Sequence, residues 1–480
     1  MSPTDQHHHD RRWAILALLG IAQLMVVLDA TIVNIALPSA QDSLGFGDES
    51  RQWVVTAYAL AFGSLLLLGG KLGDLFGRKW TFIGGLIGFA VASAIGGMAG
   101  SFGVLVAARA AQGVFGAILA PSALALLTVT FTEPQERAKA FGIFGAIAGG
   151  GAAVGLLLGG ILTEYLSWRW CLYVNLLFAL PAAFAAFTLL RNPERSGARP
   201  RLDLVGTGLA TSGLFALVFG FSHAETDGWS NGVTIGMLAY GVIAIAAFAA
   251  WQNRAKHPLL PLRVVLDRNR GGAYLSMAIA GAGMFGVFLF LTFFMQRNLG
   301  YSPIQSGLAF LPLSAVIIVT ATTGQIKLVP RYGPRVLMTL GMVLASASMV
   351  FLAQLDADST YLANVLPALI LQAAGMGLIF SPAFASATAG VRPSDAGVAS
   401  AMVNTSQQVG GSVGTAFLST MANSAASGFS GTAAEASVHG FTTAFWWAAG
   451  IFAFGAIVAG FVIERGVPQH APIGEPAMAH

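Results

Sequence analysis

Long apolar runs, separated by short polar segments, recur along the whole chain. Each run holds roughly 19 to 29 residues, enough for a helix to cross a hydrocarbon layer of about 30 Å with some tilt. Apolar and polar residues do not alternate within the runs, which indicates helices and not strands. The pattern predicts fourteen spans, at residues 13–37, 52–70, 80–99, 102–129, 138–162, 169–190, 204–222, 232–252, 272–296, 304–327, 335–355, 360–388, 396–424 and 441–463.

The composition agrees with a helical membrane protein. Hydrophobic residues make up 55% of the 480 residues and charged residues only 10%, whereas a soluble protein carries about 25% charged residues. The mean hydropathy is +0.71. The single cysteine, Cys171, excludes an intrachain disulfide. We therefore expect an all-α membrane protein embedded in a lipid bilayer.

The basic residues fall on one side of the predicted spans. If residues 1–12 lie in the cytoplasm, all but four of the 25 Lys and Arg residues fall in cytoplasmic segments. Three exceptions, Arg51, Arg169 and Arg297, lie outside, and Arg109 lies within a span. Cytoplasmic loops carry an excess of Lys and Arg, so both termini are predicted to be cytoplasmic. The basic excess reflects topology and indicates no nucleic-acid partner.

The cytoplasmic segments also divide the chain. The two longest and most basic, 191–203 and 253–270, bracket two spans and leave six spans on either side. Six plus six suggests two repeated bundles, as in one large class of secondary transporters. The predicted domains are a cytoplasmic tail at 1–12, a six-helix bundle at 13–190, a linker with two inserted helices at 191–270, a second six-helix bundle at 271–463 and a cytoplasmic tail at 464–480.

A weak trace of this repeat remains in two cytoplasmic loops. Residues 70–82 read GKLGDLFGRKWTF, and residues 324–338 read GQIKLVPRYGPRVLM. Both keep a glycine, an apolar run, a second glycine and terminal cations. The second loop has an insertion and lacks the aspartate.

Two ionisable residues lie inside the spans at similar depth. Asp29 is about nine residues from Pro38, and Arg109 about seven from Phe102, so each lies roughly 10–14 Å inside one membrane face. A charge near the bilayer centre costs on the order of 2.5–3.5 kcal/mol. The pair either only orients helices or carries protons. We favour proton coupling, because burial favours the neutral acid and a nearby guanidinium favours the carboxylate.

Five motifs lie in order along the chain and resemble those of the major facilitator superfamily. Motif A is Gly70, Asp74, Gly77, Arg78 and Lys79, and the stretch around Arg109 and Gln112 is similar to motif B. Gly142, Gly151, Gly155, Gly159 and Gly160 match the glycine spacing of motif C, which is typical of antiporters. The runs LDATIVNIALP at 28–38 and WVVTAY at 53–58 resemble signatures of the fourteen-spanner drug:proton antiporter branch.

The resemblance implies a major-facilitator fold and roles for two of the motifs. In motif A, Asp74 would bind the N-terminus of the helix that begins near Asp395, a latch for the outward-facing state; the alternative is a basic turn that only fixes topology. In motif C, glycines four residues apart let another helix backbone approach closely. The family has a proline at the position of Leu156, so the kink that proline causes is not expected here.

Polar and flexible side chains on five predicted spans are candidates for a substrate cavity. The amides at 404, 407 and 408 share one helix face and either hydrogen-bond across helices or contact substrate. A Met and Phe stripe on span 272–296 can repack around varied apolar ligands, or it is an ordinary core or lipid-facing stripe. The candidates are Asn34, Tyr58, Gln112, Met284, Phe288, Asn404, Gln407 and Gln408.

These features favour a proton-coupled exporter of hydrophobic or amphipathic small molecules, such as drugs and antibiotics. The sequence lacks a P-loop and any recognisable catalytic or metal-binding constellation, so we expect no enzyme activity and no cofactor beyond the proton-motive force. A monomer in the bacterial plasma membrane is expected, with alternating access as its mechanism. The alternatives are a proton-coupled importer of a nutrient or peptide and, less favoured, a membrane sensor without transport activity.

Overall fold

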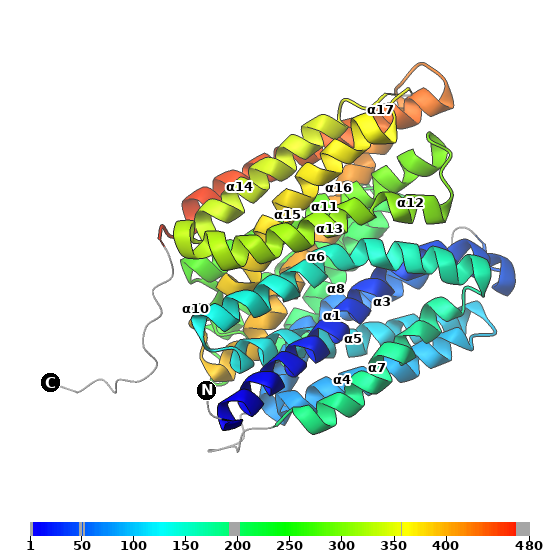
Figure 1. Cartoon of the computed structure of the whole chain (residues 1–480). Helices are drawn as coiled ribbons and strands as arrows, with labels where there is room; N and C mark the ends of the chain where they lie inside the picture. The colour runs from blue at the N-terminus through cyan, green and yellow to red at the C-terminus, as the bar shows by residue number, and fades with distance from the viewer. Residues whose placement is uncertain (1–2, 48–49, 51–52, 192–201, 357, 467–480) are drawn as a thin grey trace.

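The computed structural model describes residues 3–47, 50, 53–191, 202–356 and 358–466, and within these ranges every regular element is helical. The predicted loop 191–203 lies mostly outside them, as do Arg51 and residues 467–480 of the predicted tail. The long helices run side by side (Figure 1). They are α1 (Pro3–Leu44), α3 (Trp53–Phe76), α4 (Arg78–Gly97), α5 (Phe102–Thr130), α6 (Pro134–Tyr165), α7 (Trp170–Leu189), α8 (Leu204–Asp227), α9 (Gly232–Gln252), α11 (Arg268–Arg297), α13 (Leu311–Thr323), α14 (Val329–Leu352), α15 (Leu366–Ala387), α16 (Ala396–Ser427) and α17 (Ala433–Val462).

Shorter helical pieces continue or join these helices. α12 (Pro303–Ala309) precedes α13, and the π-helical turns η1 (Gly324–Leu328) and η2 (Tyr361–Val365) precede α14 and α15. α10 (Leu262–Val265) lies before α11, and the 3₁₀ turn η3 (Pro393–Asp395) leads into α16. The start of α1, the end of α17 and α10 all lie at the left-hand end of the bundle in Figure 1.

Twelve helices in the described part of the chain are long and apolar enough to cross a membrane. One of them, Ile304–Leu352, covers two predicted spans and is interrupted at Gly333, whose φ is 76°. α16 is not among the twelve, because its middle carries a run of hydroxyl and amide side chains. The prediction of apolar helices is therefore confirmed, while the count of fourteen spans stays a prediction.

The first helix is longer than the sequence predicts. Residues 13–37 were expected to span, yet α1 runs from Pro3 to Leu44, with Pro38 inside it. A proline inside a helix removes one hydrogen bond and crowds the preceding turn. Leu37 and Ala40 flank Pro38 and are buried in an apolar cluster with residues of α3, α5 and α7. This burial offsets the cost of the proline, so the helix continues past it.

The two loops that resemble each other in sequence also turn in the same way. Gly77 forms the turn between α3 and α4 with a φ of 96°, and Gly333 interrupts the second segment with a φ of 76°. Positive φ angles are easily reached only by glycine. The internal similarity therefore extends to backbone conformation.

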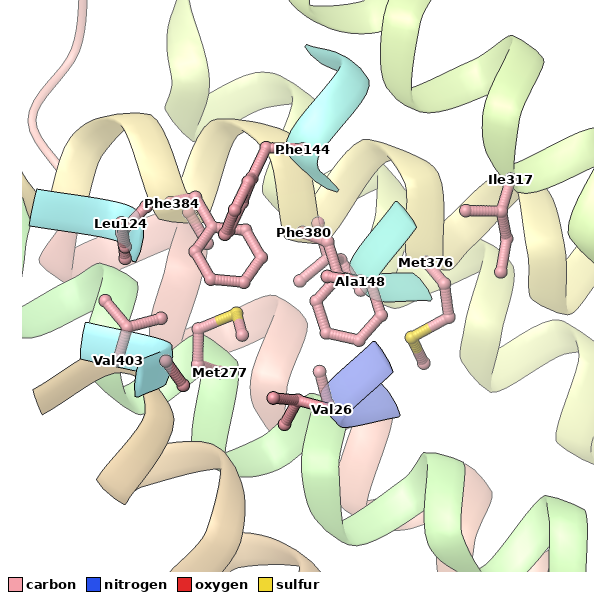
Figure 2. Close-up of a cluster of buried hydrophobic side chains, with 14 of the residues drawn as sticks. Val26, Leu124, Phe144, Ala148, Met277, Ile317, Met376, Phe380, Phe384 and Val403 are labelled. Carbon is pink, nitrogen blue, oxygen red and sulfur yellow. The ribbon is translucent and has the colours of Figure 1, made fainter. Parts of the chain in front are cut away.

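Apolar side chains fill the middle of the molecule, where helices from the first and second halves of the chain meet (Figure 2). Phe144 of α6 packs edge-on against Phe384 of α15, with ring centroids 5.5 Å apart. Val26, Leu124, Ala148, Met277, Ile317, Met376, Phe380 and Val403 are buried around them. The contact between the two halves is thus largely aliphatic, aromatic and methionine-rich.

The helix pair α8 and α9 touches both halves of the chain. On one side, Thr56 of α3 lies 3.4 Å from Ser222, oxygen to oxygen. On the other side, the Trp229 indole N–H donates to Thr420 of α16 at 2.7 Å. α8 and the turn that follows it therefore bridge α3 and α16 through polar contacts.

Candidate functional site

A buried network of polar side chains surrounds Asp29 in the centre of α1. The Arg109 guanidinium of α5 lies 2.5 Å from one carboxylate oxygen, Oδ2. The Gln112 amide, one turn further along α5, donates to the other oxygen, Oδ1, at 2.9 Å. Asp29 and Gln112 are fully buried, and Arg109 is 1% exposed. The contact between Asp29 and Arg109 expected from their equal depth is therefore present in the structure.

The sequence analysis missed two members of this network. Asn175 of α7 donates its amide N–H to Asp29 Oδ1 at 2.7 Å, and Ser93 of α4 accepts from Gln112 at 2.7 Å. Each is an isolated polar residue in a predicted span, and polar residues inside membrane spans are generally rare and functional. That signal could have identified Asn175.

Arg109 is held by further partners besides the carboxylate. Its Nε donates to the Val54 carbonyl of α3 at 3.3 Å, and one terminal nitrogen donates to Gln112 Oε1 at 2.7 Å. The guanidinium lies over the Tyr58 ring, 4.4 Å from the centroid. Residues of three helices, α1, α3 and α5, therefore fix the orientation of this cation.

The geometry around Asp29 suits an ionised carboxylate. In its hydrogen bonds with Arg109, Gln112 and Asn175, the carboxylate oxygens act only as acceptors. A protonated acid would carry an O–H donor that needs an acceptor of its own. Uptake of a proton at Asp29 must therefore change at least one of these contacts, which links protonation to the packing of α1, α5 and α7.

Motif A lies at the turn between α3 and α4 and joins the two halves of the chain. Asp74 Oδ1 accepts from the Gly397 amide at the start of α16 and from Arg78, both at 3.3 Å. Arg78 also donates to the Pro393 carbonyl. A Cβ added at Gly70 would lie 2.5 Å from the Gly397 carbonyl oxygen, so the backbones of α3 and α16 approach closely. The contact expected between Asp74 and the helix that begins near Asp395 is present.

Lys79, the last residue of motif A, does not take part in this contact. Its ammonium group donates to the Phe187 carbonyl of α7 at 2.7 Å. It also lies 5.0 Å from the centroid of the Phe187 ring. The structure therefore places Lys79 against α7 and away from α16.

The motif C glycines from Gly151 to Gly160 face α1 and α12, whereas Gly142 faces Thr322 of α13. A Cβ at Gly151 would lie 3.0 Å from Val27, and one at Gly159 would lie 3.0 Å from Ile32. Gly155 faces Leu28 and Thr31, next to Asp29, whereas Gly160 faces Ile304. α6 passes Leu156 as one continuous helix. Motif C thus brings α6 against the helix that carries the buried carboxylate.

The cavity candidates separate into two groups. Tyr58 and Gln112 belong to the ion network, and both are buried. The other candidates are half-buried, except Asn34, which is exposed on α1. Phe288 packs against Phe310 with ring centroids 5.0 Å apart. The remaining candidates are Met284, Asn404, Gln407 and Gln408.

The amides of α16 do not all make the expected contacts across helices. Asn404 donates to Ser400, within its own helix, at 3.1 Å. Gln408 lies against α3, because a Cβ at Gly63 would be 3.0 Å from its Cγ.

Comparisons with known proteins give the family. The family model described as Major Facilitator Superfamily matches residues 19–415. The chain is 49% identical over 463 residues to the puromycin resistance protein pur8 of Streptomyces alboniger, covering 95% of this chain and 92% of that protein. It is 41% identical to the cephamycin export protein CmcT of Amycolatopsis lactamdurans, covering 88% and 87%.

A solved structure shows the same fold. The human organic anion transporter MFSD10 (TETRAN) superposes with a TM-score of 0.65 at 16% identity, covering 93% of this chain and 99% of that one. The names of the relatives describe transport and resistance, which agrees with a transporter that is not an enzyme and that acts on small molecules. The chain belongs to the Major Facilitator Superfamily.

Proposed function

We propose that this protein exports a hydrophobic or amphipathic small molecule across the bacterial plasma membrane in exchange for protons, by alternating access. The single observation that carries the proposal is the buried carboxylate of Asp29, which is paired with Arg109 at 2.5 Å inside an apolar helix bundle. A charge pair with almost no solvent exposure costs several kcal/mol per ion in desolvation before its attraction is counted. A functional need for titration explains why it is retained.

The contact between the two halves supports an apolar substrate. Phe144 from the first half, and Met277, Met376, Phe380 and Phe384 from the second half, lie at their common boundary (Figure 2). Methionine has a flexible and polarisable side chain that adapts to varied shapes. When the halves rock apart, this surface would become the wall of a binding chamber for apolar groups. The names of the relatives point in the same direction, because they include resistance to puromycin and export of cephamycin.

The latch at motif A supports alternating access. Asp74 binds the first turn of α16, where backbone N–H groups lack partners within the helix and the helix dipole is positive. Separation of α3 from α16 at this end would break that contact. We assign the described conformation to a state closed at its cytoplasmic end. In the proposed topology, the fourteen long helices span the membrane and both termini are cytoplasmic. The protein acts as a monomer, in which the bundles 13–190 and 271–463 rock about the site.

Proton coupling requires no other cofactor. One proton moving through a potential of about 100 mV supplies about 2.3 kcal/mol, which corresponds to roughly a 50-fold gradient of a neutral solute. The fourteen-spanner drug:proton antiporters, whose signatures the sequence resembles, are the branch to which we assign the chain.

Uptake into inside-out membrane vesicles tests the proposal. Vesicles that contain the protein should accumulate puromycin, the first compound to test, when their interior is acidic, and an uncoupler should abolish the accumulation. Vesicles with Asp29→Asn provide the matched control. If an imposed pH gradient drives no uptake of puromycin or of any compound in a panel of dyes and antibiotics, the proposal is wrong.

A further inference from the structure

Asn175 has an unusual hydrogen-bonding environment for a buried amide. It is 1% exposed, and its Nδ2 donates to Asp29 Oδ1 at 2.7 Å. Its own oxygen, Oδ1, is buried and has no hydrogen-bond partner among the described residues. A buried acceptor left without a partner is unfavourable, because it has lost its hydrogen bonds to water and gained none in return. The Asn175 side chain that donates to the carboxylate therefore also carries a hydrogen-bond acceptor, its Oδ1, that has no donor.

Gln112, the other amide on Asp29, has no such freedom. Its Oε1 accepts from Arg109 at 2.7 Å, and its Nε2 donates to both Ser93 and Asp29. Rotation of this amide by half a turn would place its NH₂ group against the guanidinium, donor against donor. The orientation of Gln112 is therefore fixed, whereas rotation of Asn175 breaks a single hydrogen bond.

Protonation of Asp29 reverses what the carboxyl group needs from its neighbours. The neutral acid carries an O–H donor, which faces the amide N–H of Asn175 if nothing moves. Rotation of the Asn175 amide about its Cβ–Cγ bond exchanges its nitrogen and oxygen with almost no change in volume. Asn175 Oδ1, which had no donor, then accepts a hydrogen bond from the O–H group of Asp29.

We propose that Asn175 is a positioning residue that distinguishes the two protonation states of Asp29, donating to the carboxylate and accepting from the neutral acid. This inference rests on the proposed function, because it requires that Asp29 takes up a proton from water. In both states α7 holds Asp29 in place. The partner that loses its attraction on protonation is Arg109, so the guanidinium is the group released to move in the transport cycle.

The other titratable groups near Asp29 do not provide this acceptor. Arg109 from α5 has only donors. Tyr58 from α3 places its ring under the guanidinium and its hydroxyl beside Gly116 of α5, where an added Cβ would lie 3.5 Å from it. Cys171 from α7 lies against α6, with its thiol 3.8 Å from the Gly159 carbonyl oxygen. α6 itself presents glycines to this part of α1.

Infrared difference spectroscopy of the full-length protein in lipid bilayers, acid minus alkaline, tests the inference. Carbon-13 labelling of asparagine side-chain amides identifies their carbonyl bands, and Asp29→Asn identifies the carboxylic acid band of Asp29. In the wild type, the Asp29 band should appear together with a shift of one asparagine band. Asn175→Leu should lose the asparagine shift and keep the acid band, and Asn175→Ser provides the same test if the leucine variant does not assemble.

Asn298→Leu is the matched control, because its amide oxygen is also buried without a partner among the described residues. This variant should keep both bands. An Asp29 band without any asparagine shift, or a shift that persists in Asn175→Leu, would overturn the role of Asn175 and leave proton uptake intact. The absence of any Asp29 band across the pH range would overturn the proton-coupling proposal as well.

Discussion

Neutralising Asp29 alone should destabilise the fold, whereas neutralising Asp29 and Arg109 together should restore most of the lost stability. In Asp29→Asn, the new amide keeps an oxygen that can accept from Gln112 and Asn175. Its NH₂ group, however, faces the guanidinium, which is 1% exposed and always charged. The variant therefore leaves a buried cation without its counter-ion.

The magnitude follows from the burial of the pair. Two unit charges about 4 Å apart attract by about 4 kcal/mol at an effective dielectric constant of about 20. Removal of one partner from a buried pair typically costs about 3–5 kcal/mol. Arg109 keeps the Val54 carbonyl, Gln112 and the Tyr58 ring as partners, so we expect about 3 kcal/mol. The double variant Asp29→Asn/Arg109→Met should lie within about 1 kcal/mol of wild type, since uncharged replacements are often neutral.

Arg109→Met should behave differently from Asp29→Asn with pH. The carboxyl group left behind can become neutral by taking up a proton, whereas a guanidinium cannot lose one. The loss of unfolding free energy in Arg109→Met should therefore be small at acid pH and larger at alkaline pH. The loss in Asp29→Asn should show no such dependence on pH. Reversible unfolding in mixed micelles, followed by tryptophan fluorescence, gives the free energies of the wild type and the three variants. Equal stability of Asp29→Asn and wild type, or additive losses in the double variant, would refute the reasoning.

Three further predictions concern other parts of the fold. Asp74→Asn should weaken the contact with α16 by about 1.5–3 kcal/mol, the value of a hydrogen bond to a charged group, and shift spin-label distances toward the state open at this end without changing substrate affinity. Gly155→Ala should slow transport and cost about 1–3 kcal/mol of stability, because its Cβ meets Thr31, whereas Gly84→Ala, which meets open space, should not. Asp203→Ala should cost about 0.5–2 kcal/mol through loss of the N-cap of α8, which a thermal melt would measure.

The pH dependence at Asp203 has a defined sign. Burial raises its pKa, but hydrogen bonds from the Gly206 amide, Trp251 and Gln252 outweigh burial and leave the pKa below its ordinary value. The stabilisation is therefore complete above the unfolded pKa of about 3.9 and is lost as the pH falls through the lower, folded value. A penalty for Asp203→Ala that grows toward acid would contradict this sign.

For the other two variants, the contacts described above would be contradicted by unchanged spin-label distances in Asp74→Asn, or by wild-type transport and stability in Gly155→Ala.

The sequence predicted the membrane depth of Asp29 and Arg109 better than it predicted the residues that surround them. The constant rise of a helix gives depth, so Asp29 and Arg109 were placed together from their distances to the ends of their spans. The rotation of each helix about its axis depends on packing between helices, which periodicity does not fix. Asn175 and Ser93 were missed for this reason. Gln112 lies three residues after Arg109, on the same helix face, yet it was predicted to line the substrate cavity and not to bind Asp29.

In the fold, too, features set by local sequence could be predicted, whereas features set by contacts between distant segments could not. Apolar runs identified the helices, because their length is a local property. The continuation of α1 past Pro38 depends on the burial of Leu37 and Ala40 against other helices, which the local sequence does not show. The contact of Asp74 with Gly397 joins residues more than 300 positions apart, and only the family resemblance suggested it. Lys79, grouped with Asp74 in motif A, binds a carbonyl of α7 instead.

The central claim is that Asp29 exchanges protons during transport, and proton movement driven by substrate tests it most directly. Purified protein is reconstituted into proteoliposomes that contain a pH-sensitive dye, and a gradient of a compound that the membrane vesicles accumulate is imposed without a pH gradient or a membrane potential. We predict that this compound, leaving through the wild-type protein, moves protons in the opposite direction, and that Asp29→Asn moves none. Substrate-driven proton movement at wild-type rates in Asp29→Asn would contradict the account.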